Sequence, residues 1–210
     1  YSTVSAFTKA IDERTPYNAT HTKQVAGYTE GLLDFLQKKH EQGESEIYFS
    51  PQEAEQIVMA AYLHDVGKLV IPLSIMNKAT RMGRSGLKEI HERYRLIEAY
   101  LTIDRLEGRL DEKVWKRMTA DLKELEERIR KADKPTKLSK AEIRYFTEMG
   151  NRIYFGKDGI SISWLTPREL KNLQIDRGTL NDEERKNMEY HAVATEKILK
   201  EIQFGKQYDR

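Results

Sequence analysis

The residues in this chain best suited to chemistry are three histidines and one aspartate with apolar neighbours. His64 and Asp65 are adjacent in the run AAYLHDVGKLVIPLS, and His21 and His191 lie in two other segments that carry apolar residues. An ionised aspartate in an apolar setting is costly unless it is paired, hydrogen-bonded or bound to a metal. A single histidine on an apolar helix face is more often a hydrogen-bonded core residue than a ligand. Three such histidines on separate helices, together with an aspartate, instead favour a metal site.

The types of these ligands indicate the chemistry. Neutral imidazoles and a carboxylate suit iron, manganese, zinc or nickel, and only the carboxylate of Asp65 can bridge two ions. Two divalent ions about 4 Å apart lower the pKa of a water held between them and stabilise an in-line displacement at phosphorus. We therefore predict phosphoester hydrolysis by a two-metal-activated hydroxide. Lys68 follows His64 by four residues and could contact a phosphate oxygen. Without the metal ligands, a solvated lysine near a helix end would be the better interpretation.

Helices are predicted to position these residues. The first begins near Pro16 and carries His21. Its apolar stripe, spaced by three and four residues, consists of Val25, Tyr28, Leu32 and Phe35. The second begins at the capping box SPQE and runs through His64 until Gly67. The third begins at NDEE and carries His191 among apolar residues, so three helices each place a histidine on an apolar face.

The chain between the second and third of these helices has a different character. Residues 81–132 are rich in charge and predict two antiparallel helices. The first of the two has an apolar stripe formed by Leu87, Ile90, Tyr94, Ile97 and Leu101. A short helix is expected between Ser139 and Gly150, a β-hairpin in RIYFGKDGISIS, and a further helix at TPRE. The segment is therefore predicted to be mainly helical.

Composition excludes several classes of protein. The 210 residues include 36 Lys and Arg against 34 Asp and Glu, so no overall charge favours nucleic acid. Cysteine is absent, which excludes disulfides and thiolate metal sites and fits a reducing, cytoplasmic location. No apolar stretch approaches the roughly 20 residues of a membrane-spanning helix. Because the chain opens at Tyr1, we expect a fragment of a longer protein, which could be membrane-anchored.

The motif LHDVGK resembles the signature of the HD phosphohydrolase superfamily. Its surroundings resemble the HD-GYP branch, whose members hydrolyse cyclic di-GMP, in three segments: DERTPYNATHTKQVAGY, HDVGKLVIPLSIMNK and GTLNDEERKNMEYHAVATEKIL. The resemblance implies that His21, His64, Asp65 and His191 bind metal and that Lys68 and Asp65 act in catalysis. It also implies two divalent ions, with Fe or Mn favoured over Zn, Ni or Mg. The implied substrate is a cyclic dinucleotide.

The resemblance also implies a domain plan and shows departures from it. We expect an all-α HD-domain helical bundle formed by residues 1–78 and 177–210. Residues 79–176 are then a long helical insertion with a small β-hairpin. Some family members carry a third metal ligand, a glutamate, where this chain has Tyr17. The paired histidines and GYP motif of the branch are not present before Arg210, and we expect truncation rather than degeneration.

Two alternatives to a cyclic dinucleotide phosphodiesterase stay open. An HD phosphohydrolase could act on another nucleotide. A catalytically incomplete HD module could instead serve signalling, with a homodimer formed through the insertion by the stripe that ends at Leu101. His40 is expected to be exposed, and His91 is not expected to bind metal.

Overall fold

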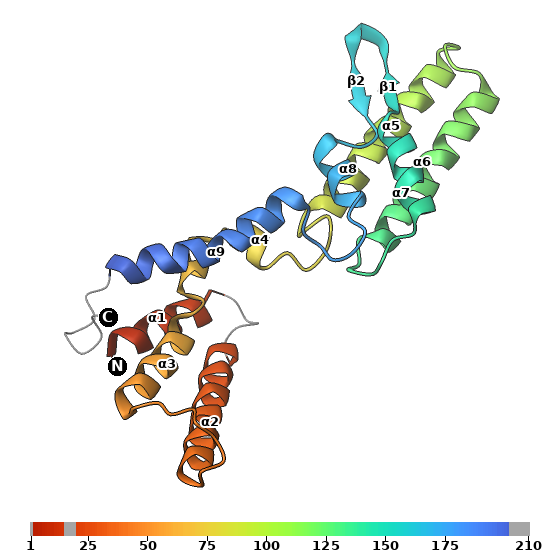
Figure 1. Cartoon of the computed structure of the whole chain (residues 1–210). Helices are drawn as coiled ribbons and strands as arrows, with labels where there is room; N and C mark the ends of the chain where they lie inside the picture. Colours follow the sequence, from red (N-terminus) through yellow and green to blue (C-terminus); the bar gives the residue numbers. More distant parts are fainter. Residues whose placement is uncertain (1, 15–19, 202–210) are drawn as a thin grey trace. The chain divides into compact units, whose positions relative to one another are not determined.

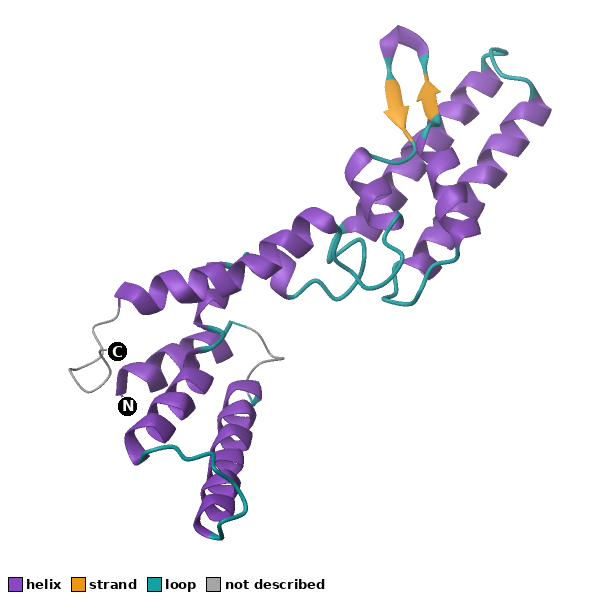
Figure 2. Cartoon of the chain, in the orientation of Figure 1, coloured by secondary structure: helices purple, strands orange, loops and turns teal. Residues whose placement is uncertain are grey.

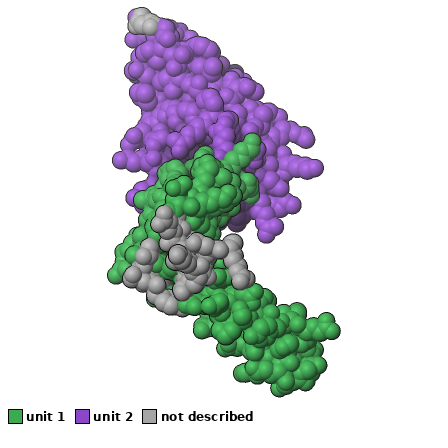
Figure 3. Space-filling model, turned by 60° about the vertical axis from the view of Figure 1, so that its left-hand side comes forward, with its two compact units in different colours: residues 1–77, 184–210 green, residues 78–183 purple. Residues whose placement is uncertain are grey.

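The computed structural model of the chain describes residues 2–14 and 20–201 (Figure 1). These residues form helices and one small antiparallel sheet of two strands, which confirms the predicted all-α class with a hairpin (Figure 2). None of the described helices has the length and apolar character needed to cross a bilayer. The chain divides into two compact units (Figure 3). Unit 1 comprises residues 1–77 and 184–210, and unit 2 comprises residues 78–183.

Unit 1 contains the helices that carry the predicted site. They are α1 (Ser2–Asp12), α2 (His21–Glu41), α3 (Pro51–Leu63), the 3-10 helix η1 (Val66–Val70), α4 (Leu73–Met76) and nearly all of α9 (Asp182–Glu201). The capping box at the start of α3 is confirmed, with Ser50 accepting from the Glu53 N–H and the Glu53 side chain accepting from the Ser50 N–H. Helix α3 packs against α1 and α2, and α1 also contacts η1. The buried apolar side chains of the unit include Ile11, Ala26, Leu33, Leu63, Val66, Ile71 and Ala194.

Two features of unit 1 differ from the sequence-based expectation. Helix α3 ends at Leu63, so it does not continue to Gly67, and a 3-10 helix follows it. The apolar stripe on α2 is largely exposed, at 77% for Tyr28 and 57% for Leu32. The buried face of α2 instead carries Thr22, Ala26 and Leu33. The apolar spacing thus predicted the helix correctly and its packed face wrongly. Pro16, the predicted start, lies outside the described residues.

Unit 2 contains the elements predicted for the intervening segment. They are α5 (Gly86–Leu106), α6 (Glu112–Ala132), α7 (Lys140–Gly150), β1 (Ile153–Phe155), the 3-10 helix η2 (Lys157–Gly159), β2 (Ser161–Ser163) and α8 (Pro167–Leu173). Helices α5 and α6 pack together, and β1 pairs antiparallel with β2. Helices α7 and α8 begin where helices were predicted, and each starts with a capping box. The hairpin is also confirmed.

The core of unit 2 is built on the apolar stripe of α5. Tyr94 and Ile97 are completely buried, and Ile90 and Leu101 are 1% exposed. These side chains join a cluster that includes Leu122, Leu125, Ile129, Phe146, Tyr154 and Trp164. The prediction that this stripe pairs with a second copy of the chain is therefore wrong, because the unit's own core already covers it.

A buried arginine connects distant segments of unit 2. Arg81 is fully buried and donates to the carbonyls of Ala132 at 2.6 Å and Ile175 at 3.3 Å. It also donates to the carbonyls of Lys134 and Thr136. Desolvation lowers the pKa of Arg81. These hydrogen bonds connect the beginning, middle and end of the unit, so its loops are held by contacts within the unit.

Candidate metal centre

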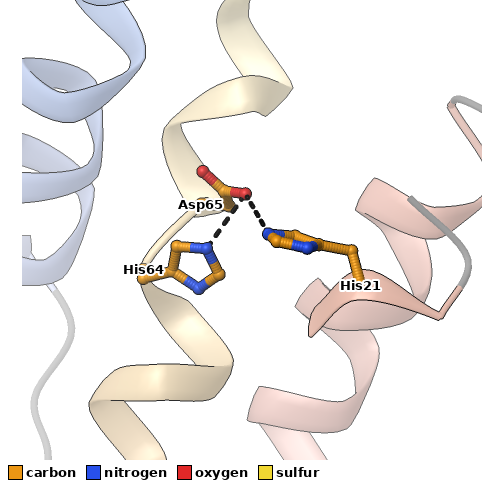
Figure 4. Close-up of side chains that lie close together, drawn as sticks. All are labelled: His21, His64 and Asp65. Carbon is orange, nitrogen blue, oxygen red and sulfur yellow. Dashed lines mark ion pairs between the residues drawn. The ribbon is translucent and has the colours of Figure 1, made fainter. Parts of the chain in front are cut away.

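Unit 1 brings the predicted metal ligands together around one carboxylate. His21 is the first residue of α2, His64 caps the end of α3, Asp65 precedes η1, and His191 lies on α9. The Nε2 atom of His64 lies 3.1 Å from Oδ2 of Asp65, and the Nε2 atom of His21 lies 3.8 Å from the same oxygen (Figure 4). The Nε2 atom of His191 lies 3.5 Å from Oδ1 of Asp65. Residues separated by more than 100 positions thus converge on Asp65.

The ligand atoms are close enough to share ions. One atom each from His21, His64 and Asp65 forms a group in which all atoms lie within 4.8 Å of one another. Metal–nitrogen and metal–oxygen bonds of about 2.0–2.2 Å need ligand atoms with separations of this order. His191 is not part of that group and faces the other carboxylate oxygen. The two oxygens of Asp65 therefore face different histidines.

Backbone carbonyls fix the orientation of two imidazole rings. Nδ1 of His64 lies 2.7 Å from the carbonyl oxygen of Ala61, and Nδ1 of His191 lies 2.5 Å from that of Met188. Because a carbonyl only accepts hydrogen bonds, each Nδ1 carries a proton and donates it. In the neutral form, which is the form that binds metal, the Nε2 atom of each ring then carries the lone pair and faces Asp65. Metal-binding histidines are typically held in this way by a hydrogen bond from the other ring nitrogen.

Asp65 is the buried centre of the group, and Lys68 is its nearest cation. The Asp65 side chain is 6% exposed, whereas that of His21 is 46% exposed. Lys68 Nζ lies 2.6 Å from Oδ2 of Asp65. The contact arises because residues three apart share a face in a 3-10 helix. Helix α3 ends before Gly67, so Lys68 reaches the site through a 3-10 turn and not through the continuous α-helix expected from the sequence.

The donor set fits divalent metal ions. In their metal-binding forms the imidazole Nε2 atoms and the carboxylate present lone pairs, and a metal ion among them would accept all of these. Imidazole nitrogen and carboxylate oxygen together suit Fe, Mn, Zn and Ni. The exposed side of the group, formed by His21, leaves an approach for a substrate. The site can therefore hold metal and remain open to a ligand.

The other two histidines have other partners. His40 is half-buried rather than exposed, with its ring 5.2 Å from that of Tyr48. His91 lies in unit 2 and pairs with Glu126 at 2.6 Å, so it is not among the grouped ligands. Tyr17, at the position of the third ligand in some family members, lies outside the described residues.

Two residues beside the centre were missed by the sequence analysis. Arg14 donates to the carbonyls of Ile71, at 2.9 Å, and Leu69, and so holds the segment that follows Lys68. Thr195 contacts the backbone on both sides of Asp65. The only sequence signal for Thr195 is its place four residues after His191, on the same helix face. No sequence signal indicates Arg14.

Comparisons with known proteins identify the family of the chain. The family model for the HD domain matches residues 18–140, more than half of the chain. The 3'3'-cGAMP-specific phosphodiesterase 3 of Vibrio cholerae serotype O1 is 27% identical over 118 residues, which cover 53% of this chain and 23% of that protein. The chain thus spans less than a quarter of the length of this curated relative. No solved structure matches the chain. On the family match and the HD motif that it contains, the chain belongs to the HD domain family.

Proposed function

We propose that the chain contains the metal centre of a phosphodiesterase that hydrolyses a cyclic dinucleotide. The observation that carries this proposal is the convergence of three Nε2 atoms on the two oxygens of one buried carboxylate. Lys68 already donates to Asp65 at 2.6 Å, so three imidazoles facing the same carboxylate are more than a structural ion pair needs, which supports a metal-binding role. The family to which the chain belongs supports the same assignment.

The two oxygens of Asp65 face different histidines, and this arrangement supports two metal ions. Oδ2 of Asp65, with His21 and His64, would hold one ion, and Oδ1, with His191, would hold the other. Asp65 would then be the bridging ligand. The donor set favours Fe or Mn, with Zn, Ni or Mg as alternatives. Ions held in this way supply Lewis acidity at phosphorus and lower the pKa of a bound water.

The chain's own residues have separate tasks in this proposal. The carbonyls of Ala61 and Met188 orient the imidazoles of His64 and His191, so that both rings are set before a ligand arrives. Lys68 is the cationic side chain next to Asp65, and its ammonium group can bind a non-bridging phosphate oxygen. Lys68 is therefore proposed to bind the phosphate rather than a metal ion.

Two sequence similarities support a cyclic dinucleotide as the substrate. The segments around His21, His64 and His191 resemble the HD-GYP branch, which implies cyclic di-GMP. The curated relative is described as specific for 3'3'-cGAMP. Both compounds are cyclic dinucleotides and differ in one base. We propose the class of substrate on this basis, with cyclic di-GMP as the first compound to test.

The test is a turnover assay on the full-length protein loaded with Mn²⁺ or Fe²⁺. Cyclic di-GMP, 3'3'-cGAMP and a nucleoside triphosphate are supplied in separate reactions, and the linear products are measured by chromatography. We expect a cyclic dinucleotide to be opened and Asp65→Asn to abolish turnover. Lys68→Met should keep its metal and lose turnover by about 100-fold or more. Lys23→Met, an exposed lysine on α2, is the matched control and should act like the wild type.

The outcomes separate the parts of the proposal. Metal-loaded protein that hydrolyses the triphosphate and neither cyclic dinucleotide would move the substrate to another nucleotide. Protein that binds no metal would remove the enzymatic function altogether.

One observation favours self-association as a second function. Leu96, Ile103 and Leu106 lie on α5 and are 47%, 45% and 73% exposed. Their spacing of seven and three residues places them on one side of the helix. If this face pairs with a second copy, light scattering will show a dimer that Ile103→Glu converts to a monomer. A wild-type monomer at high concentration would exclude this function.

A further inference from the structure

One hydroxyl group connects the HD segment to the helix that carries the last histidine. Thr195, on α9, accepts a hydrogen bond from the Gly67 N–H at 2.9 Å. The same hydroxyl donates to the carbonyl oxygen of His64 at 3.2 Å. Thr195 is 8% exposed, and Gly67 is buried. Asp65 therefore lies between the two backbone groups that Thr195 binds.

The backbone needs these hydrogen bonds because the helix changes type at this point. Helix α3 ends at Leu63, and η1 begins at Val66. Carbonyls at the end of a helix and N–H groups at the start of the next have no partner within their own helices. The His64 carbonyl and the Gly67 N–H are such groups, and a single hydroxyl satisfies both. Leaving these two buried backbone groups without hydrogen bonds would be costly.

The two segments approach closely at the same point. A Cβ atom on Gly67 would lie 2.0 Å from the carbonyl oxygen of His191 and 2.5 Å from the backbone nitrogen of Thr195. Glycine is therefore required for α9 to lie directly against η1. The hydroxyl of Thr195 completes this contact, and the backbone of His191 is part of it.

We propose that Thr195 is a positioning residue that sets the distance between His191 and Asp65 and thereby forms the half of the metal centre that contains His191. The inference rests on the proposed function, because it assumes that these residues bind metal. Thr195 and His191 are four residues apart on one face of α9, so fixing Thr195 also fixes the position of the His191 ring. The ring lies 3.5 Å from Oδ1 of Asp65, whereas His21 and His64 are paired with Oδ2.

The test compares three variants of the full chain by titration with Co²⁺, whose visible absorption reports the ligands of each ion. Thr195→Val keeps the shape and removes the hydroxyl, Thr195→Ser keeps the hydroxyl, and Thr195→Ala removes both. We expect the wild type and Thr195→Ser to bind two ions. Thr195→Val and Thr195→Ala should bind the first ion normally and the second at least about 10-fold more weakly, as when groups that orient a ligand are lost.

A control separates positioning from general loss of stability. Thr8 is buried in the same unit, and its hydroxyl donates to the carbonyl of Val4 within its own helix. Thr8→Val should therefore bind two ions. Far-UV circular dichroism checks that each variant is folded. If Thr195→Val does not fold, Thr195→Ala is the variant that tests loss of the hydroxyl.

Each result has a distinct meaning. Loss of the second ion in Thr195→Val and Thr195→Ala, with recovery in Thr195→Ser, supports the positioning role. Wild-type affinity in folded Thr195→Val or Thr195→Ala overturns it and leaves the proposed function intact. Equal weakening in Thr195→Ser and Thr195→Val also overturns it, because packing rather than the hydroxyl would then be responsible. A wild-type chain that binds no Co²⁺ removes the proposed function and this inference together.

Discussion

Replacing Gly67 with alanine perturbs the contact between η1 and α9 directly. The new Cβ atom would lie 2.0 Å from a backbone oxygen, whereas real Cβ atoms essentially never approach closer than 3.0 Å. Helix α9 would therefore have to withdraw by about 1 Å, and overpacking of this kind costs about 1–3 kcal/mol. The withdrawal would also carry His191 away from Asp65. We expect Gly67→Ala to lower the free energy of unfolding and to weaken metal binding.

The same substitution elsewhere in unit 1 should have the opposite effect. Gly27 is exposed in the interior of α2, and a Cβ atom there would meet nothing within 4 Å. Gly27→Ala should raise the free energy of unfolding by about 0.5–1 kcal/mol, because alanine loses less entropy in a helix. Urea unfolding followed by circular dichroism measures both changes, and elemental analysis after dialysis gives the bound metal per chain.

One result of comparing these two variants would contradict the contact between η1 and α9. If Gly67→Ala unfolds at the same urea concentration as Gly27→Ala and keeps all of its metal, then η1 and α9 are not in the close contact described. The assigned role of the glycine would then be wrong.

Three further predictions concern unit 2. Burial raises the pKa of Glu169, but hydrogen bonds from Arg93 and a backbone N–H outweigh it, so the pKa is below its ordinary value of 4.5. The stabilisation is thus present above pH 4.5 and lost as the pH falls through the folded-state pKa, and Glu169→Gln should remove this pH dependence of the urea midpoint. Burial and the hydrogen bond to Asp104 raise the pKa of Tyr154 to about 12 from 10.0, so its contribution is complete below pH 10.0 and disappears as the pH rises through about 12. Ultraviolet titration should show this late tyrosine, and Tyr154→Phe should remove it. Arg81→Met should destabilise the unit by at least about 3 kcal/mol in urea unfolding, because several buried carbonyls lose their donor.

Local signals predicted much of the fold. The helix starts at Ser50, Ser139 and Thr166 were predicted, and each forms a capping box, because a cap depends on residues only three positions apart. The β-hairpin and the core stripe of α5 were also predicted, since alternation and helical spacing act over short distances. The residues that meet at Asp65 were identified from their types and from the family resemblance, and not from local pattern alone.

Contacts between distant segments were not predictable in the same way. Helix α3 ends and η1 begins where the Thr195 hydroxyl binds the backbone. No pattern in the sequence near Gly67 indicates that a hydroxyl 128 residues away accepts a hydrogen bond from the Gly67 N–H. The apolar spacing of α2 predicted a helix but not which face packs, so Tyr28 and Leu32 were assigned to the wrong side. In both cases the local structure depends on contacts with a residue of another element, and the sequence pattern of one element does not identify that residue.

The most direct test of the metal centre is the number of Mn²⁺ ions bound by the full chain at equilibrium. The wild type should bind two ions, and Asp65→Asn should bind none, because the proposed bridge loses its charge. Asp34→Asn, which removes an exposed carboxylate from α2, should bind two. A wild-type chain without bound Mn²⁺, or an Asp65→Asn variant that still binds two ions, would contradict the assignment of Asp65 as the ligand shared by both halves of the site.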